Sequence, residues 1–340
     1  MIQTGIGNSK CLVLGGYLVL DHSNTALVLS LSPRVQCTGT LTNESFNNII
    51  HVETLPHKLS FDLKPSDWKN PQEFLGKYER FILSSFHVFF STFPLPKNQL
   101  FLSIVGDSQF YTENGKTGLG SSSATTVSII QCLFKLLQPT LADLDTLVFK
   151  YAAVSHSLAQ GNVGSCFDIS CSVWGSQIFR RPSPNFISIE KINEQWDNEH
   201  ISYQLPNHLH CLLLSTPFGG SSTANLVRSF NAKAQEDPEL YEELKNSVIS
   251  AAEILKNGIP EEIRKSFAVV KKKLRELSIK WEIDVLPTPV YEIASKVEEI
   301  DGVITSIIPG AGGYDSIAVI TQRPTIDFSE LGLTVIASSC

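Results

Sequence analysis

A glycine- and serine-rich segment contains the residue types in this sequence that most clearly fit a chemical role. Residues 116–125 read Lys-Thr-Gly-Leu-Gly-Ser-Ser-Ser-Ala-Thr and lead directly into a segment with the apolar spacing of a helix. Glycine lets a backbone approach a ligand closely. The first turn of a helix presents unpaired N–H groups and a dipole that favours negative charge. The segment therefore predicts a cradle for an anion, most plausibly phosphate.

The residues expected to form the cradle are consecutive: Gly118, Leu119, Gly120, Ser121, Ser122 and Ser123. Serine hydroxyls bind phosphate oxygens or Mg²⁺, and Lys116 adds a positive charge. The segment is not a P-loop, because no Gly-Lys-Ser/Thr closes it, and it lacks the third glycine of the dinucleotide motif. A plain glycine turn before a helix N-cap is the alternative interpretation.

Two further glycine-rich turns, Gly15-Gly16 and Gly310 to Gly313, lie next to apolar segments. Lys10 stands one position before the first apolar run, and Asp168 ends a Gly/Ser turn of its own. One such turn is weak evidence, but three together favour a single site that they line jointly.

Composition limits the class of protein. The chain has 340 residues, 42% of them hydrophobic, which is enough for a globular protein of two domains. Its formal net charge of -7 argues against a nucleic-acid or anionic-membrane surface. Seven scattered cysteines without a Cys-x-x-Cys pair favour neither disulfides nor a zinc site. With no signal sequence or membrane span expected, we predict a cytoplasmic protein.

Strand-like and helix-like segments are interleaved without strict alternation, which indicates an α+β protein. We expect strands over 11–14, 27–31 and 35–40, and helices over 72–90 and 141–159. Composition changes near Pro182, so we predict an N-terminal domain over 1–185 and a C-terminal domain over 186–340.

The glycine turns, taken in order, resemble the motifs of the GHMP small-molecule kinases. The matching segments are Gly15 to Asp21, Lys116 to Ser122, Gly164 to Asp168, and Pro309 to Asp315. Within that family the sequence looks most like the fungal-type phosphomevalonate kinases. The resemblance spans nearly the whole chain. It implies an N-terminal domain like ribosomal protein S5 domain 2 and a ferredoxin-like C-terminal α/β sandwich.

The resemblance also implies a reaction, in which the γ-phosphate of ATP is transferred to (R)-5-phosphomevalonate in isoprenoid and sterol synthesis. The cradle would hold the ATP phosphates, Ser122 would be the Mg²⁺ ligand, and Lys10, Asp168 and Lys116 would be catalytic. Residues expected to contact the acceptor are Tyr17, Ser165, Arg180, Ser222, Gly312, Gly313 and Asp315. The expected partners are small molecules, with neither nucleic acid nor membrane, and the protein is expected to be a monomer or a homodimer.

Two departures from the family pattern bear on the mechanism. Asn8-Ser9 precede Lys10 where relatives usually carry Pro-Gly. His156 occupies the position at which mevalonate kinases have a metal-binding glutamate. Because a phosphomonoester is already largely ionised at neutral pH, the acceptor needs no strong base, and Asp168 either removes a proton or orients Lys10. Alternatives to the phosphomevalonate kinase interpretation are a mevalonate kinase, a diphosphomevalonate decarboxylase, a catalytically silent metabolite sensor and a ligand-free scaffold.

Overall fold

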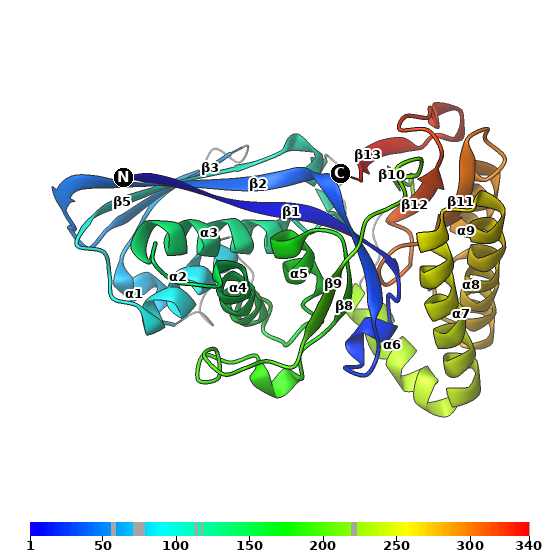
Figure 1. Cartoon of the computed structure of the whole chain (residues 1–340), viewed down its shortest axis with the longest axis horizontal. Helices are drawn as coiled ribbons and strands as arrows, with labels where there is room; N and C mark the ends of the chain where they lie inside the picture. The colour runs from blue at the N-terminus through cyan, green and yellow to red at the C-terminus, as the bar shows by residue number, and fades with distance from the viewer. Residues whose placement is uncertain (56–58, 71–78, 113–114, 117, 219–222, 340) are drawn as a thin grey trace.

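The computed structural model describes residues 1–55, 59–70, 79–112, 115–116, 118–218 and 223–339. Two layered units lie side by side along the long axis of the molecule (Figure 1). The N-terminal unit is a long sheet with helices packed beneath it, and the C-terminal unit is a smaller sheet with helices on its outer side (Figure 1). The fold is therefore α+β in two units, as predicted.

The sheet of the N-terminal unit is organised around one long strand. It runs in the order β4-β3-β5-β2-β8-β9, and β1 pairs with β2 on the other side. Its strands are β1 (Ile2–Leu14), β2 (Ala26–Ser45), β3 (Ile50–Leu55), β4 (Leu59–Leu63), β5 (Asn98–Gly106), β8 (Gln177–Arg180) and β9 (Glu199–Ser202). A separate short hairpin, β6 (Tyr111–Thr112) and β7 (Gly115–Lys116), precedes the predicted cradle.

The helices of the N-terminal unit are α1 (Pro65–Trp68), α2 (Arg80–Thr92), α3 (Ser121–Leu137), α4 (Leu144–Gln160) and α5 (Phe167–Trp174). α3 lies directly against the sheet, with α2 and α4 beyond it (Figure 1). Buried aromatic rings fill the space between these helices, among them Phe89, Phe134 and Tyr151. This packing holds the start of α3 and the middle of α4 at fixed positions relative to β1.

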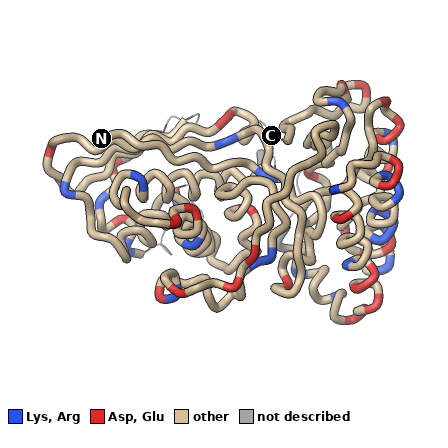
Figure 2. Tube along the Cα trace, in the orientation of Figure 1, with Lys and Arg blue, Asp and Glu red and all other residues tan. Residues whose placement is uncertain are grey.

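The C-terminal unit pairs its strands in the order β11-β12-β10-β13. The strands are β10 (His210–Ser215), β11 (Val303–Ile307), β12 (Ser316–Thr321) and β13 (Thr334–Ser338). The helices are α6 (Thr223–Glu236), α7 (Pro238–Asn257), α8 (Pro260–Lys280) and α9 (Thr288–Val297). Charged residues of both signs gather along these outer helices, whereas the middle of the long sheet carries few (Figure 2).

Three predicted strands are corrected by the structure. The strands expected over 27–31 and 35–40 form one continuous strand, β2, and the strand expected over 11–14 begins at Ile2. Pro33 does not interrupt β2 because the pairing with β1 shifts there, from Asn8↔Arg34 to Ser9↔Leu31. A β-bulge of this kind accommodates a residue that has no N–H to donate. The helix expected over 72–90 is observed as α2; residues 71–78 lie outside the described residues.

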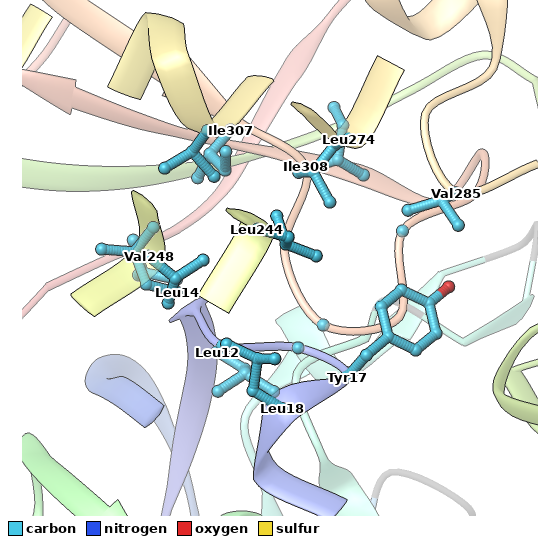
Figure 3. Close-up of a pocket in the computed structure, with 16 residues that line it drawn as sticks. Leu12, Leu14, Tyr17, Leu18, Leu244, Val248, Leu274, Val285, Ile307 and Ile308 are labelled. Atoms are coloured by element: carbon cyan, nitrogen blue, oxygen red, sulfur yellow. The ribbon is translucent and has the colours of Figure 1, made fainter. Parts of the chain in front are cut away.

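The two units meet across a tight apolar joint. Side chains from β1 and from α7 and α8 close around a void of about 30 Å³, among them Leu12, Leu14, Leu244 and Leu274 (Figure 3). The turn after β11 enters the same place, since the Gly310 N–H donates to the carbonyl oxygen of Leu12 at 2.9 Å. Anything bound between the units therefore lies beside an apolar joint.

The predicted boundary at residue 186 lies before the last strand of the first sheet, because β9 pairs with β8 up to Ser202. We propose that the two units divide between Ser202 and His210, where the second sheet begins. No helix of the described chain has both the length and the apolar composition needed to span a membrane.

Candidate active site

The predicted cradle is the N-terminal turn of α3. Gly118 and Gly120 have φ of 72° and 82°, a left-handed conformation that side chains rarely adopt, and Gly120 is the residue before the helix. The turn directs the first N–H groups of α3 toward a cavity of about 250 Å³, which Ser121 and Ser122 also line. The start of a 17-residue helix and a cavity of this kind together fit a bound phosphate chain.

The three serines have different roles. Ser123 is fully buried, and its hydroxyl donates to the Gly120 carbonyl oxygen at 2.8 Å, so that it stabilises the turn. Ser122 lies at the cavity, and its Oγ is 3.1 Å from Nε2 of His156 on α4. Ser121 lines the cavity. The predicted phosphate contacts therefore reduce to Ser121, Ser122 and the backbone, while Ser123 supports them from behind.

Lys10, on β1, reaches the cradle from the sheet. Its Nζ donates to the Gly118 carbonyl oxygen at 2.7 Å, and its backbone N–H donates to the Leu119 carbonyl oxygen at 3.1 Å. The ammonium also lies 5.2 Å from the centre of the Phe167 ring, within the range of a cation–π interaction. Although Asn8-Ser9 replace the Pro-Gly of relatives, these contacts fix Lys10 at the entrance of the cradle.

A second, larger cavity of about 660 Å³ opens between the two units. Lys10, Gly118 and Phe167 line both cavities, so the two meet at the Lys10 side chain. The predicted acceptor residues Ser165, Gly312 and Asp315 also line the larger cavity. The structure thus places an anion cradle and a space for a second small molecule on either side of one ammonium group.

Asp168 is in the first turn of α5 and faces the smaller cavity. One carboxylate oxygen accepts the Ile169 N–H at 3.0 Å, and the other lies 3.9 Å from Nε2 of His156. Among the described residues no ion pair joins Asp168 to Lys10, whose ammonium is held instead by the Gly118 carbonyl. In this structure Asp168 therefore does not orient Lys10 directly.

The third glycine turn closes the larger cavity from the C-terminal unit. A Cβ on Gly16 would lie 1.7 Å from the Gly310 carbonyl oxygen, and one on Gly312 would lie 2.0 Å from the Val285 carbonyl oxygen. Both positions therefore require glycine for steric reasons. The Gly313 N–H donates to the Val285 carbonyl oxygen at 3.1 Å, which anchors the turn, and Gly313 does not line the cavity.

Tyr17 is a packing residue more than a contact with a ligand. It is buried, its ring stacks on Phe230 with centroids 3.8 Å apart, and its hydroxyl donates to the Ala311 carbonyl oxygen. Burial raises the pKa of the Tyr17 hydroxyl well above its usual range. The predicted substrate contact is replaced in this structure by a hydrogen bond that fastens the third turn to the first.

Arg180 does not line either cavity. Its guanidinium lies 2.6 Å from Glu199 on the neighbouring strand β9 and 2.9 Å from Nε2 of His22. The hydrogen bond that the guanidinium donates to the Glu199 carboxylate raises the pKa of Arg180. The prediction that Arg180 binds the acceptor is therefore not supported, because its guanidinium is paired with Glu199 on the edge strand β9.

Two other predicted residues cannot be placed as side chains. Ser222 lies outside the described residues. Lys116 is described only as a backbone position of β7, directly before the cradle.

Two residues at or next to the cavities were not among the predicted site residues. Arg80, the first residue of α2, lines the larger cavity, and His156 joins Ser122 to Asp168. Neither belongs to a glycine turn. His156 was noted only as a departure from a family pattern, and no local signal marks Arg80.

The residues at the cradle offer few metal ligands of their own. No group of three or more His, Cys, Asp or Glu side chains is arranged around a metal position in the described part of the chain. The Ser122 hydroxyl and the Asp168 carboxylate both line the smaller cavity, and oxygen donors of this type suit Mg²⁺. They fit a metal that takes its remaining ligands from phosphate oxygens and water.

Comparison with known proteins agrees with this geometry. Residues 109–176 match the family described as the GHMP kinases N terminal domain. The chain superposes on a phosphomevalonate kinase of Streptococcus pneumoniae, solved with phosphomevalonate and AMPPNP, with a TM-score of 0.76 and 18% identity; the alignment covers 100% of this chain and 99% of that one. It superposes on the Methanococcus jannaschii mevalonate kinase with a TM-score of 0.73 and 17% identity, covering 100% and 98% of the two chains.

The chain shares its fold with these two kinases, and residues 109–176 resemble the GHMP kinases N terminal domain. Curated relatives give a more specific likeness. It is 24% identical to the peroxisomal phosphomevalonate kinase of Arabidopsis thaliana over 92% of this chain and 88% of the relative. It is also 24% identical to the phosphomevalonate kinase of Candida albicans over 92% and 87%. Both of these curated relatives are named as phosphomevalonate kinases.

Proposed function

We propose that this protein is an ATP-dependent phosphomevalonate kinase, which transfers the γ-phosphate of ATP to (R)-5-phosphomevalonate and releases ADP. The observation that carries the proposal is the position of Lys10, where the anion cradle of α3 meets the cavity between the units. A phosphoryl group passing from one cavity to the other passes this ammonium. The relatives that match most of the chain are named as kinases of this one acceptor.

The chemistry required fits the residues present. The acceptor phosphate is already largely ionised near neutral pH, so the main obstacle is to bring two anions together. Positioning and positive charge therefore dominate catalysis. The α3 N-terminus holds the phosphates of the nucleotide, and Lys10 neutralises charge at the transfer point. Lys116, immediately before the cradle, is proposed as a second cation.

Ser122 and Asp168 are the residues that would hold Mg²⁺, which neutralises charge on the ATP phosphates when bound. His156 donates to or accepts from the Ser122 hydroxyl and faces the Asp168 carboxylate. Its role is to hold these two oxygen donors on the same side of the smaller cavity. Asp168 acts here through its negative charge and position, since no base is needed to ionise the acceptor.

Ser165, Gly312 and Asp315 are proposed to surround the acceptor, because all three line the larger cavity. Gly313 and Tyr17 support that wall from outside it. The cytoplasmic location predicted from the sequence stays a prediction, and one relative is named as peroxisomal.

The direct experiment measures ADP release by the purified protein with Mg-ATP, with phosphomevalonate and mevalonate offered in separate reactions. Turnover with phosphomevalonate alone supports the proposal. Turnover with mevalonate alone assigns the chain to the neighbouring class of mevalonate kinases, with which it also shares its fold. Absence of turnover with both, combined with ATP-dependent thermal stabilisation, indicates a silent nucleotide-binding relative.

A further inference from the structure

Arg80 supplies a positive charge to the larger cavity that no motif of the sequence predicts. It is the first residue of α2 and lines this cavity together with Lys10, Gln160, Asn162 and Ser165. In the described chain the charged side chains at the cavity wall are Lys10, Arg80 and Asp315. Among the described residues that line the larger cavity, Arg80 alone carries a guanidinium group. Arg80 does not line the smaller cavity of the cradle.

The guanidinium of Arg80 is available to a ligand. None of the ion pairs between described residues includes it, and its Cζ lies 4.9 Å from the centroid of the Phe81 ring. Arg180 provides the contrast, because its guanidinium is already paired with Glu199. A planar guanidinium lying against an aromatic ring keeps its N–H groups directed outward along the ring edge.

A chain of contacts connects Arg80 to the transfer point. The Phe81 ring stacks on the ring of His156, with centroids 5.2 Å apart, and Nε2 of His156 is 3.1 Å from the Ser122 Oγ in the cradle. Phe81 itself lines the smaller cavity, next to Arg80 in the larger one. Arg80 is thereby held on the side of the acceptor cavity that adjoins the cradle.

This placement selects one group of the acceptor. The inference rests on the proposed function, in which the acceptor is phosphomevalonate. This molecule has two anionic groups, a phosphate that must adjoin the cradle and a carboxylate at the opposite end. Guanidinium binds phosphate with paired, charge-assisted hydrogen bonds. We propose that Arg80 binds the phosphate of the acceptor and thereby distinguishes phosphomevalonate from mevalonate. Lys10 approaches the same phosphate from the β1 side.

The test compares wild type, Arg80→Gln and Arg80→Lys in steady-state turnover, with Arg180→Gln as the control arginine outside the cavity. We expect Arg80→Gln to raise KM for phosphomevalonate about 10- to 100-fold, because the substitution removes a charged hydrogen bond to the acceptor phosphate. KM for ATP is expected to stay within about twofold. Arg80→Lys restores part of the loss because it keeps the charge without the planar fork, and Arg180→Gln leaves both KM values unchanged.

Mevalonate as a competitive inhibitor separates the two anionic groups, because it has the carboxylate and lacks the phosphate. Its inhibition constant is expected to be the same for wild type and Arg80→Gln. A parallel rise in that constant would assign Arg80 to the carboxylate and overturn the inference. An unchanged KM for phosphomevalonate, or a rise confined to KM for ATP, would overturn it as well. Turnover of phosphomevalonate by wild type tests the proposed function separately, so that the two failures are distinguishable.

Discussion

Two clusters of charged side chains among the described residues differ in how fully their hydrogen-bonding capacity is satisfied. In the C-terminal unit, Oε1 of Glu298 accepts hydrogen bonds from Lys271, from the Thr305 hydroxyl, and from both the N–H and the hydroxyl of Ser306. In the N-terminal unit, the Lys10 ammonium donates to a single carbonyl, and the Asp168 carboxylate lies 3.9 Å from Nε2 of His156. Lys10 and Asp168 line the smaller cavity, and Lys271 and Glu298 line a separate hollow of about 540 Å³ beside α8 and α9, so the two clusters differ in hydrogen bonding and not in access to a cavity.

The difference separates structural from functional charge. A buried ion pair whose hydrogen-bonding capacity is satisfied holds elements of the fold together. Here it joins α8, the end of α9 and β11. Charged side chains that keep hydrogen-bonding capacity at a cavity are arranged for a ligand that completes it. By this criterion the Lys271–Glu298 cluster is part of the fold and the Lys10–Asp168 cluster is part of the site. Substitutions can disrupt each cluster without touching the other.

Lys10→Met is expected to have the largest effect on activity. It removes the ammonium at the transfer point, and loss of a charge that stabilises the transition state costs about 10²- to 10³-fold in kcat. The backbone hydrogen bond to Leu119 remains, so the thermal midpoint should change little. Lys265→Met, at a lysine whose side chain is 74% exposed on α8, is the matched control and should leave kcat unchanged. A large fall in the thermal midpoint of Lys10→Met would contradict the distinction between the functional and the structural cluster.

Glu298→Gln is expected to do the reverse. It leaves the Lys271 ammonium buried without its counter-charge, which costs about 3 kcal/mol in the free energy of unfolding. Because the cluster is remote from both cavities, kcat of the folded variant should match wild type. Urea unfolding measures the first quantity and steady-state turnover the second. Lower activity at full stability would show that the cluster serves the site.

The same pair predicts how stability depends on pH. Burial opposes ionisation of Glu298, but the Lys271 ammonium and the donated hydrogen bonds outweigh it and lower the pKa of Glu298. Burial also lowers the pKa of Lys271, against the opposing attraction of Glu298. A lowered carboxylate pKa contributes stability above its ordinary value, and this is lost as the pH falls through the folded value. Wild type should therefore lose its advantage over Glu298→Gln below about pH 4.5.

Gly120→Ala is expected to have the smallest effect of the three and to act on the cradle alone. Its φ of 82° disfavours a side chain, and a Cβ would lie 3.0 Å from the Ser123 Oγ and 3.1 Å from Cε of Lys10. The strain of about 1–2 kcal/mol should raise KM for ATP about tenfold and leave KM for the acceptor unchanged. Gly332→Ala, with φ of 70° in the same left-handed region and open space around it, carries similar strain away from the site. If it alters KM for ATP equally, the local account fails.

The cradle was predictable from sequence because its signal is local. Gly118, Gly120 and Ser122 are adjacent in the chain, and the turn and helix they form depend on neighbouring residues. Lys10 was predicted from its place in a motif, and the structure brings it to the cradle through the packing of β1 against α3.

The acceptor side was less predictable because it is assembled from distant segments. Arg80 reaches the cavity only through the position of α2, and its neighbours in sequence carry no pattern. Arg180 was expected at the acceptor, but its partner Glu199 comes from a strand 19 residues further on, which spacing alone does not reveal. The continuity of β2 through Pro33 likewise depends on a bulge that only the pairing with β1 defines.

The most direct test of the account is the rate of ADP release with Mg-ATP and each acceptor offered alone. The account predicts turnover with phosphomevalonate and none above background with mevalonate. Lys10 and Arg80 are both proposed to bind the acceptor phosphate, which mevalonate lacks. Equal or faster turnover with mevalonate would contradict it, since a hydroxyl acceptor needs a base that the Lys10–Asp168 arrangement is not proposed to supply.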